Sequence, residues 1–400
     1  MTSMLYRGSV KNLWGPVKLG SEDAVVFEYT DAYSVFDWGK MPDLLPKKGE
    51  ALAVLAAEWF EKLESPEVWK EYSKTSDAHA LRKANRFGGL FNEVGEELQS
   101  QGLRTHYRGV CEASPVSVQN VEPKRLAQLS RPAKFLAVQQ VSVVKPQQAV
   151  IFGRTVPDYQ ATRNSSLPRL VPLEVVFRMG CPPGSSLIER AAKDPGYTAS
   201  LGFPDLVVEP GARWNFPILE LFTKLETSDR LLSFSEALAI SGITAVQLQE
   251  ILFKTIWVAG ILRFWCSQRG LELADGKLEW AMAENGKCFL VDAIGPDELR
   301  LMKNGVQLSK EFLRGFYRNT SWYHAVEKAK AQAKVQGIAD WKKLVQETPP
   351  TLPAGFRELA SQVYLVLAHE LTGQRFPEAW SLEKVIRELK IAEEQRAGHA

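Results

Sequence analysis

Short runs of apolar residues alternate with turns over the first forty positions, and the spacing then changes to a helical one. Residues 24–29 (AVVFEY) have strand composition, and so do residues 135–144 (FLAVQQVSVV). Between them, residues 50–63 (EALAVLAAEWFEKL) predict a helix. The apolar side chains of this helix recur at helical spacing: Leu52, Leu55, Trp59, Phe60 and Leu63. The start of the chain therefore predicts a small antiparallel sheet followed by a helix.

The second half of the chain changes from strand patterns to helix patterns. A strand is predicted at 173–177 (LEVVF) and a long helix at 244–268. Residues 145–170, which are rich in Pro, Gln, Asn, Ser and Arg, read as an irregular excursion. From about residue 309 the pattern is mostly helical. The chain therefore predicts an α+β fold, with a sheet-rich front half and a helix-rich back half.

The length of 400 residues is enough for two domains, or for two lobes around one cleft. We expect a β-rich N-terminal lobe at 1–144, an irregular insertion at 145–170 and an α+β C-terminal lobe at 171–400. Apolar residues make up 45% of the chain, which supports a sizeable core. The formal net charge is only +2 and the basic residues form no single block, which argues against nucleic-acid binding.

The expected setting is the cytoplasm, with no membrane partner. The four cysteines are widely spaced and include no CxxC pair, which indicates a reducing compartment rather than disulfides or zinc. The first six residues lack the apolar core of a signal peptide. The most apolar stretch, 251–265, carries Lys254 and Arg263 and is better explained as a buried helix than as a membrane span. The sequence leaves open whether the chain is a monomer or a homo-oligomer.

A predicted hairpin carries the carboxylates of greatest chemical interest. Its strands, 271–281 and 288–294, are joined through Asn-Gly, which is a strong hairpin signal. Glu279 and Asp292 can lie on adjacent strands and converge on one Mg²⁺, a hard cation that prefers oxygen ligands. In an ordinary hairpin both would face solvent. Against that reading, further charges crowd the same strands: Asp275, Lys277, Asp297 and Arg300.

Two other segments are suited to phosphate groups. Gly8 allows close approach of the backbone and Lys11 could neutralise the charge, although G-x-x-K is usually only a turn. Arg178 follows a strand and precedes the loop at 181–186 (CPPGSS), whose hydroxyls and amides could seat a phosphate. A surface arginine beside a Pro-Gly turn is equally consistent with this segment. The GxxxxGK[ST] and GxGxxG motifs are absent, and the five histidines form no triad or metal spacing.

Several motifs occur along the chain in one order. They are YRGSVKNLW (6–14), YTDAYSVFDWGKMPDLLPKKG (29–49), GLRTHY (102–107), PLEVVFRMGCPPGSS (172–186), PILELFTKLETSD (217–229), LADGKLEW (273–280), LVDAIGPDELR (290–300) and SKEFLR (309–314). This ordered set resembles the SAICAR synthase (phosphoribosylaminoimidazole-succinocarboxamide synthase) family of purine biosynthesis, in its longer, eukaryote-like branch. The resemblance extends over most of the chain.

The resemblance implies a fold and a reaction. The fold would be two-lobed and distantly like protein kinases and ATP-grasp enzymes, with ATP between an antiparallel β lobe and a larger α+β lobe with a helical C-terminus. The reaction would activate the carboxylate of a carboxyaminoimidazole ribotide with ATP and Mg²⁺. The amine of L-aspartate would then form an amide, with release of ADP and phosphate. Such chemistry needs cations on the transferred phosphoryl group and close placement of both reactants.

The resemblance also implies roles for individual residues. Glu279 and Asp292 match the Mg²⁺ ligands. The matches to the nucleotide site are Gly8, Lys11 and Glu226. The matches to catalytic positions are Lys224, Asp229 and Arg178. The matches to substrate-binding positions are Arg178, Ser186 (with Ser185 as the alternative), Arg300, Lys310, Arg314, Asp31, Ser34 and Asp37.

Departures from the family pattern lie within the site. The family's Asp-Glu is Asp292-Ala293 here, Gly295 replaces a serine, and Ala32 replaces an arginine. Gln139-Gln140 stands where basic residues are usual, and the 145–170 insertion interrupts the nucleotide hinge. These changes keep two alternatives open: an ATP-binding pseudoenzyme, or an amide ligase with another acid and amine. A kinase-type phosphotransferase is disfavoured because HRDxxxxN is absent.

Overall fold

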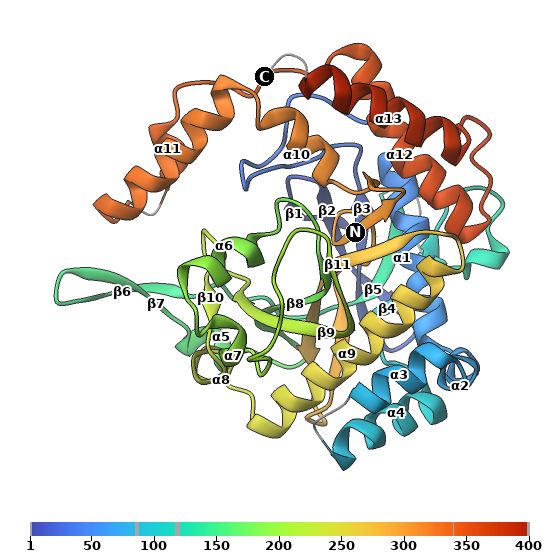
Figure 1. The fold of residues 1–400 in the computed structure, drawn as a ribbon. Helices are drawn as coiled ribbons and strands as arrows, with labels where there is room; N and C mark the ends of the chain where they lie inside the picture. Colours follow the sequence, from blue (N-terminus) through green and yellow to red (C-terminus); the bar gives the residue numbers. More distant parts are fainter. Residues whose placement is uncertain (1, 85–87, 117–120, 339, 398–400) are drawn as a thin grey trace.

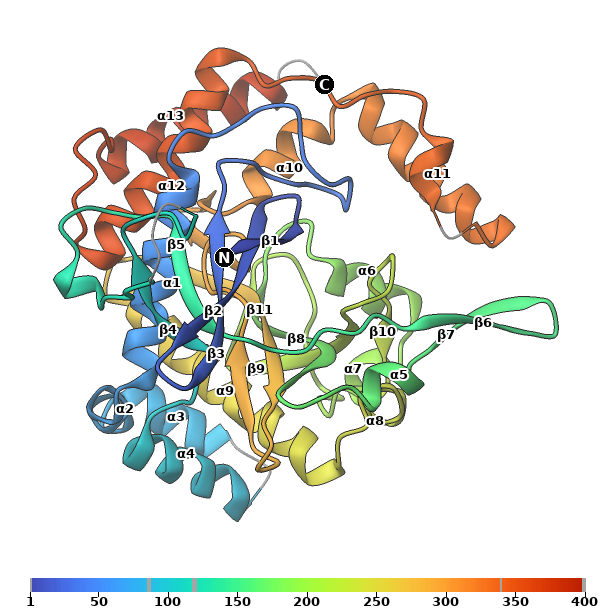
Figure 2. The ribbon, with the colours of Figure 1, turned by 180° about the vertical axis from the view of Figure 1, so that it is seen from behind.

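A computed structural model describes residues 2–84, 88–116, 121–338 and 340–397 of the chain. Parts of the three predicted domain ranges therefore lie outside the described residues, namely 1, 85–87, 117–120, 339 and 398–400. The described strands form three antiparallel sheets of five, seven and two strands. The predicted α+β class is confirmed (Figures 1 and 2).

The five-stranded sheet is built from the N-terminal part of the chain. Its strands run in the order β1-β2-β3-β5-β4. Their bounds are β1 (Ser3–Arg7), β2 (Lys11–Leu19), β3 (Glu22–Tyr29), β5 (Phe135–Gln139) and β4 (Tyr107–Cys111). The strand predicted at 135–144 therefore ends five residues early, because the chain leaves the sheet after Gln139 and bridges Arg169 of the second sheet through Ser142.

The seven-stranded sheet forms the centre of the molecule. Its order is β10-β9-β8-β11-β13-β14, and β12 also pairs with β11. The bounds are β8 (Arg169–Cys181), β9 (Ala212–Thr223), β10 (Leu231–Leu232), β11 (Glu272–Met282), β12 (Cys288–Val291), β13 (Leu299–Lys303) and β14 (Val306–Gln307). The β11–β12 hairpin confirms the one predicted around Asn-Gly, and Gly286 there has the left-handed φ of +75°.

Helices cover both sheets. Those before the insertion are α1 (Lys48–Glu64), α2 (Pro66–Ser73), α3 (Ser76–Ala84) and α4 (Gly89–Gln101), with the 3₁₀ turn η1 (Leu126–Gln128). The middle helices are α5 (Gln160–Arg163), α6 (Ser186–Lys193), α7 (Tyr197–Ser200), α8 (Phe234–Ser241) and α9 (Ala245–Ser267). The last are α10 (Glu311–Tyr317), α11 (Ser321–Gln336), η2 (Trp341–Leu344), α12 (Ala354–Thr372) and α13 (Leu382–Ala397).

The long helix α9 packs against one face of the central sheet. It begins at a capping box in which Thr244 caps the backbone N–H of Gln247 and Gln247 caps that of Thr244. It packs on β8, β9 and β11 on one side and on α3 and α4 on the other (Figure 1). It is long and apolar enough to span a membrane, but 67% of its most apolar 18-residue stretch is buried inside the protein. The prediction of a buried core helix is therefore confirmed.

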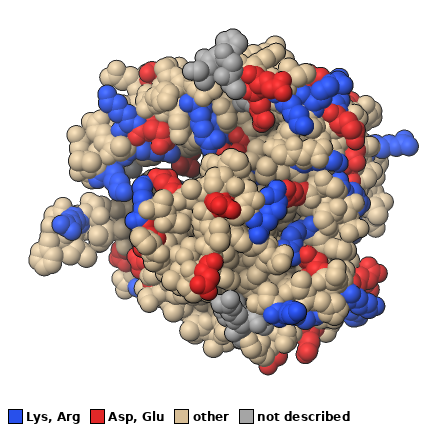
Figure 3. Space-filling view, viewed as in Figure 1, with Lys and Arg blue, Asp and Glu red and all other residues tan. Residues whose placement is uncertain are grey.

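Two segments project from the body. Residues predicted as irregular contain a regular hairpin, β6 (Gln147–Ile151) and β7 (Arg154–Asp158), with Phe152 fully exposed at its turn. Composition misled the prediction here, because a hairpin that is solvated on both faces needs no apolar alternation. Both ribbon views show this hairpin and α11 extending outward (Figures 1 and 2). On the face drawn in Figure 3, basic and acidic side chains are mixed, and the chain carries nearly equal numbers of each, with a net charge of +2.

Candidate functional site

Neighbouring strands of the central sheet present polar side chains on one face. β8 and β11 pair so that Glu174 lies opposite Glu279 and Arg178 lies opposite Asp275. β9 places Glu220 on the same face, opposite Val176 of β8. Because side chains of a strand alternate between faces, the intervening apolar residues of β8 point toward α9. The sheet thus has one apolar face for the core and one charged face for chemistry.

The charged face lines a pocket of about 290 Å³, which we call the central pocket. It lies over β8, β11 and β13 and is closed by the start of α10. Its charged and hydroxyl-bearing residues are Glu174, Arg178, Ser186, Asp229, Asp275, Lys277, Asp297, Glu298, Arg300, Ser309, Lys310, Glu311 and Arg314. Six of the sixteen residues expected to form the site are therefore brought to one lining: Arg178, Ser186, Asp229, Arg300, Lys310 and Arg314.

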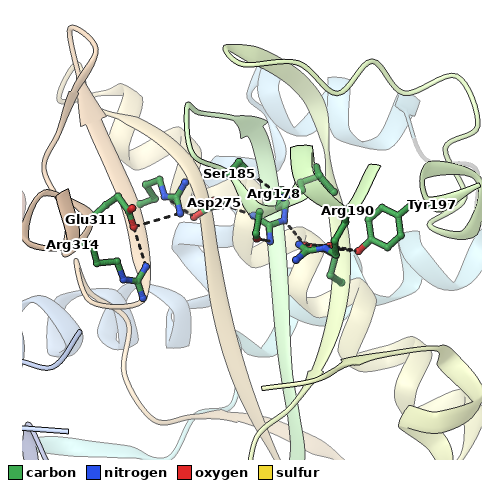
Figure 4. Close-up of polar contacts among 11 residues, drawn as sticks. Arg178, Ser185, Arg190, Tyr197, Asp275, Glu311 and Arg314 are labelled. Atoms are coloured by element: carbon green, nitrogen blue, oxygen red, sulfur yellow. Dashed lines mark hydrogen bonds and ion pairs between the residues drawn. The ribbon is translucent and has the colours of Figure 1, made fainter. Parts of the chain in front are cut away.

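One end of the pocket, which we call the arginine end, consists of Arg178, Arg300 and Arg314 with their carboxylate partners. Arg178 is 5% exposed and forms ion pairs with Glu220 and, at 3.3 Å, with Asp275. Its guanidinium also lies 3.4 Å from the Ser186 hydroxyl. Figure 4 shows Arg178 between Asp275 and the pair formed by Arg190 and Tyr197.

The buried carboxylate of Glu220 holds the Arg178 guanidinium in place. This carboxylate is 1% exposed and also accepts Arg190 at 2.7 Å and the Tyr197 hydroxyl. Burial alone would raise its pKa, but Arg178 and Arg190 lower the pKa of Glu220 below its usual range. Arg178 is therefore fixed in place before any ligand arrives.

The other arginines of this end keep unused donors. Arg300 lies 3.5 Å from Asp275 and 3.8 Å from Glu311, and Arg314 lies 3.0 Å from Glu311. Nη1 of Arg300 and Nε of Arg314 are buried and have no hydrogen-bond acceptor among the described residues. Buried N–H groups without an acceptor are costly, so these donors fit an incoming anion such as a phosphate.

A second charged cluster, which we call the lysine end, adjoins the central pocket through Glu174 and Lys277, which line it. The other members of this cluster are Lys11, Lys224, Glu279 and Asp292. The Lys224 ammonium bridges Glu174 at 2.9 Å and Glu279 at 2.5 Å. Lys277 lies 2.7 Å from Glu174. Lys11, from β2 of the five-stranded sheet, pairs with Asp292 just after β12 of the central sheet. This last ion pair joins the two sheets across the site.

Glu279 and Asp292 have the donor set that a hard divalent cation requires. Glu279 is 5% exposed, and burial together with repulsion from Asp292 raises its pKa to about 7. Asp292 is half-buried, and Lys11 and Lys224 hold the pKa of its carboxyl well below the usual range. Two carboxylates that repel each other in a buried site suit a cation, and Mg²⁺ binds through one or two carboxylates plus phosphate oxygens and water. Among the described residues no three acidic, histidine or cysteine side chains form a metal cage.

The turn before Lys11 requires a glycine at position 8. The Gly8 N–H donates to the Lys11 carbonyl at 3.0 Å. A Cβ at Gly8 would lie 2.3 Å from that same oxygen, so a larger residue cannot keep this turn. The Lys11 ammonium lies 4.2 Å from the centre of the Phe27 ring and points toward Asp292. The turn therefore presents a glycine backbone and one cation above the lysine end.

Five expected site residues belong neither to the lining of the central pocket nor to the lysine end and the turn above it. Asp31 accepts from the N–H of Gly49 at 3.0 Å, near the start of α1. Asp37 is exposed and pairs with Lys330 of α11 at 3.3 Å, and Ser34 is half-buried. Ser185 caps α6, so of the two serines it is Ser186 that faces the pocket. Glu226 accepts from Tyr159 at 2.9 Å, next to the projecting hairpin.

Several residues of the site were missed at the level of sequence. Glu174 and Glu220 occupy polar-face positions of strands that otherwise read as apolar, LEVVF and ILELF. A carboxylate inside such a run is the signal that could have identified both. Lys48 is fully buried and pairs with Asp297 at 2.8 Å. No local pattern distinguishes it from any lysine at a helix start.

Comparisons with known proteins agree on one family. The SAICAR synthetase family matches residues 4–123 and 153–330 of the chain. A protein of Archaeoglobus fulgidus, provisionally named phosphoribosylaminoimidazole-succinocarboxamide synthase, is 32% identical over 91% of this chain and 92% of its own length. The synthase of that name from Thermoplasma volcanium is 24% identical over 93% of this chain and 99% of its own.

A solved structure supports the fold. The structure described as SAICAR-synthase from Saccharomyces cerevisiae complexed with SAICAR superposes with a TM-score of 0.55 at 16% identity. The superposition covers 94% of this chain and 96% of that one. At this identity the likeness speaks for the fold alone.

Proposed function

Because the chain belongs to the SAICAR synthetase family, we propose that it is an ATP-dependent carbon–nitrogen ligase of purine biosynthesis. Its substrates are carboxyaminoimidazole ribotide, L-aspartate and ATP, and its products are the amide SAICAR, ADP and phosphate. The observation that carries the proposal is the pairing of a central pocket whose arginine end offers free donors with an adjoining lysine end of lysines and carboxylates. We assign the enzyme to the cytoplasm and its partners to small molecules.

The arginine end receives the phosphate of the ribotide. Arg178, Arg300 and Arg314 surround it with guanidinium donors, and Ser186 adds a hydroxyl. The free donors on Arg300 and Arg314 are the groups that a phosphate would satisfy. Asp275 lies between Arg178 and Arg300 and keeps their guanidinium groups apart and oriented. The ribotide therefore binds with its imidazole carboxylate toward the lysine end.

The lysine end receives the ATP phosphates. Gly8 and Lys11 approach them from the five-stranded sheet, and Glu279 and Asp292 would hold Mg²⁺. When bound, Mg²⁺ neutralises phosphate charge and polarises the phosphoryl group under transfer. Lys224 and Lys277 stand beside it and keep further positive charge at the point where the phosphoryl group moves.

The reaction proceeds in two displacements. An oxygen of the ribotide carboxylate attacks the γ-phosphorus of ATP, and the bond to ADP breaks with its electron pair on ADP. The neutral amine of L-aspartate then attacks the acyl carbon, phosphate leaves, and the amine gives up a proton. Asp229 lies at the pocket lining with its pKa raised to about 6 by burial and by Glu174, and it is our candidate acceptor for that proton.

The remaining expected residues keep lesser roles in this proposal. The Lys310 ammonium lines the same pocket as Lys277, and we assign it to the imidazole carboxylate of the ribotide where that group points toward the lysine end. Glu226, Asp31, Ser34 and Asp37 lie outside the lining, so we assign them to supporting contacts rather than to the reacting atoms.

The test is an ADP-release assay with ATP, Mg²⁺, carboxyaminoimidazole ribotide and L-aspartate, in which each component is omitted in turn. We expect release only with all four, and loss of release in Glu279→Ala. Release that continues without L-aspartate, or a silent protein that still binds ATP, would contradict the proposal. The second result would favour a pseudoenzyme.

A further inference from the structure

Asp297 lines the central pocket, but the two side chains that hold its carboxylate lie outside the lining. The Lys48 ammonium lies 2.8 Å from Oδ2 of Asp297, and the Tyr364 hydroxyl donates to Oδ1 at 2.7 Å. Both partners are fully buried, and neither of them lines the pocket. Because an ionised carboxylate has about four acceptor positions, Asp297 keeps acceptor capacity for a ligand in the pocket.

The three residues come from elements that are far apart in the sequence. Lys48 begins α1, Tyr364 lies within α12, and Asp297 lies in the turn between β12 and β13. Helices α1 and α12 pack against each other, as both ribbon views show (Figures 1 and 2). The Lys48 ammonium also lies 5.0 Å from the centre of the Tyr364 ring, where it is attracted to the π-face. A helix from the C-terminal part of the chain therefore supports the wall of the pocket.

The backbone of the turn that carries Asp297 is also fixed. The N–H of Lys277 in β11 donates to the Glu298 carbonyl at 3.1 Å. The N–H of Lys310, next to the start of α10, donates to the Pro296 carbonyl at 3.2 Å. With its backbone tied on both sides, the turn leaves the direction of the Asp297 carboxylate to its two side-chain partners.

The charge of Asp297 suits it to accept a hydrogen bond from a ligand. Burial alone would raise its pKa, but Lys48 and Lys310 lower the pKa of the Asp297 carboxyl to about 2. Burial and the charge of Asp297 raise the pKa of Tyr364 well above its usual range, so the hydroxyl stays a donor. An ionised carboxylate forms its strongest hydrogen bonds with N–H and O–H donors, and a ligand that brings an N–H group to this wall would satisfy it.

We propose that Lys48 and Tyr364 are positioning residues that hold the Asp297 carboxylate at the wall of the central pocket, where it accepts an N–H from the amino group of a substrate. The inference rests on the proposed function, because that function supplies two such groups: the amino group on the imidazole of the ribotide and the amine of L-aspartate. The arginine end is built in the same way, since Arg178 lines the pocket and its buried partner Glu220 does not.

The experiment measures the KM of each substrate and the free energy of unfolding in urea, both for the full chain. The variant is Tyr364→Phe, which removes one hydroxyl and keeps the ring beside Lys48. The matched control is Tyr72→Phe, outside the pocket lining. The Tyr72 hydroxyl donates to Asp77 at 2.8 Å, and Asp77 pairs with Arg263 at 2.6 Å, so the control breaks the same kind of contact.

We expect the two variants to lose similar amounts of stability, because each loses one hydrogen bond from a buried tyrosine to a paired carboxylate. Only Tyr364→Phe should raise the KM of the ribotide or of L-aspartate, by about tenfold, because a displaced contact group weakens binding. The KM for ATP should stay unchanged, and the substrate whose KM rises is the one that donates to Asp297. In an Asp297→Asn background, Tyr364→Phe should have no further effect on that KM, since Tyr364 acts through Asp297.

The outcomes separate this inference from the function on which it rests. Lost stability without a change in any KM, in a chain whose wild type is active, overturns the positioning role and leaves the proposed function standing. An equal rise in the KM for ATP, or additive effects of Tyr364→Phe and Asp297→Asn, also overturns it. If Tyr364→Phe fails to fold, Asp297→Asn decides alone, and unchanged KM values for the ribotide and L-aspartate overturn the inference. A wild-type chain without turnover contradicts the proposed function and overturns this inference with it.

Discussion

The arginine end and the lysine end are both built from ion pairs, but they are assembled differently. At the arginine end, Arg178, Glu220 and Asp275 all come from adjacent strands of one sheet. At the lysine end, Lys11 comes from the five-stranded sheet and Asp292 from the turn after β12. The contacts of Arg178 thus lie within a single sheet, whereas the lysine end is closed by a contact between two sheets.

This difference teaches how each end meets its ligand. The arginine end is preorganised, because Glu220 holds Arg178 in place and Arg300 and Arg314 keep buried N–H donors that can bind an anion. At the lysine end the carboxylates differ: the pKa of Glu279 is raised to about 7, whereas Lys11 and Lys224 lower the pKa of Asp292. We therefore expect changes at the arginine end to cost stability and ribotide affinity. Changes at the lysine end should act on nucleotide, metal and pH dependence.

The largest effect is expected when Arg178 loses its buried partner Glu220. Glu220→Gln removes the buried negative charge shared by Arg178, Arg190 and Tyr197. Breaking one partner of a buried ion pair costs about 3–5 kcal/mol, and we expect the free energy of unfolding in urea to fall by that amount.

The control for this change is an exposed pair on the same sheet. Arg213 of β9 and Glu272 of β11 lie 2.7 Å apart, with side chains 59% and 37% exposed. Glu272→Gln should cost about 1 kcal/mol or less, because surface pairs contribute little. Equal losses in the two variants would show that the arginine end is no more rigid than the surface.

A smaller effect is expected when the charge of Arg178 is kept but its shape is changed. Arg178→Lys retains a cation, yet an ammonium cannot serve Glu220, Asp275 and a phosphate oxygen together as a guanidinium does. We expect the KM for the ribotide to rise by about 100-fold, equivalent to about 2.7 kcal/mol, with the KM for ATP nearly unchanged. Arg213→Lys is the matched control. A parallel rise in both KM values would mean that the two ends are not independent.

The fold was largely predictable from sequence because its signals are local. The strand composition of LEVVF, the Asn-Gly turn and the apolar run of α9 each specify an element without knowledge of the rest. The β6–β7 hairpin was not predicted, because both of its faces are solvated and no alternation marks it. Periodicity reports burial, so an element that buries nothing is invisible to it.

The site was predictable only where residues share a strand or a motif. Glu279 and Asp292 were identified as a pair because one hairpin carries both. Glu220 and Lys48 were missed, since their partners Arg178 and Asp297 are 42 and 249 positions away. Such contacts depend on strand order and helix placement, and sequence spacing does not encode them.

A further prediction concerns the contact that closes the lysine end. Lys11→Met keeps the length of the side chain and its packing on Phe27 but removes the charge that faces Asp292. We expect the KM for ATP to rise by about 30-fold, or about 2 kcal/mol, because one charged contact to phosphate is lost. Lys18→Met, in the exposed part of the same strand, is the control and should behave as wild type. If ribotide binding weakens instead, Lys11 belongs to the other substrate.

The smallest effect is expected from pH, and it separates Lys310 from the arginine end of the same pocket. Burial and the neighbouring cations Arg314, Lys48 and Lys277 lower the pKa of Lys310 to about 8, against the pull of Asp297. Lys310 therefore loses its positive charge as the pH rises through 8, whereas the guanidinium groups of the arginine end stay charged. The pH dependence of stability has the opposite sign to that of ligand binding. A lysine in the unfolded chain keeps its proton up to about pH 10.5, so the free energy of unfolding increases as the pH rises from 8 toward that value.

Binding titrations at pH 7 and pH 9 test this prediction with two ligands. The ribotide, whose carboxylate we place near Lys310, should bind about tenfold more weakly at pH 9, which corresponds to about 1.4 kcal/mol. Ribose 5-phosphate, which reaches only the arginine end, should bind nearly equally at both values because its phosphate, with a second pKa of about 6, is already mostly dianionic at pH 7. Lys310→Arg keeps its charge at pH 9 and should abolish the difference for the ribotide. If both ligands weaken together, the alkaline loss originates at the arginine end, and the contrast between a titrating lysine and permanently charged guanidinium groups is wrong.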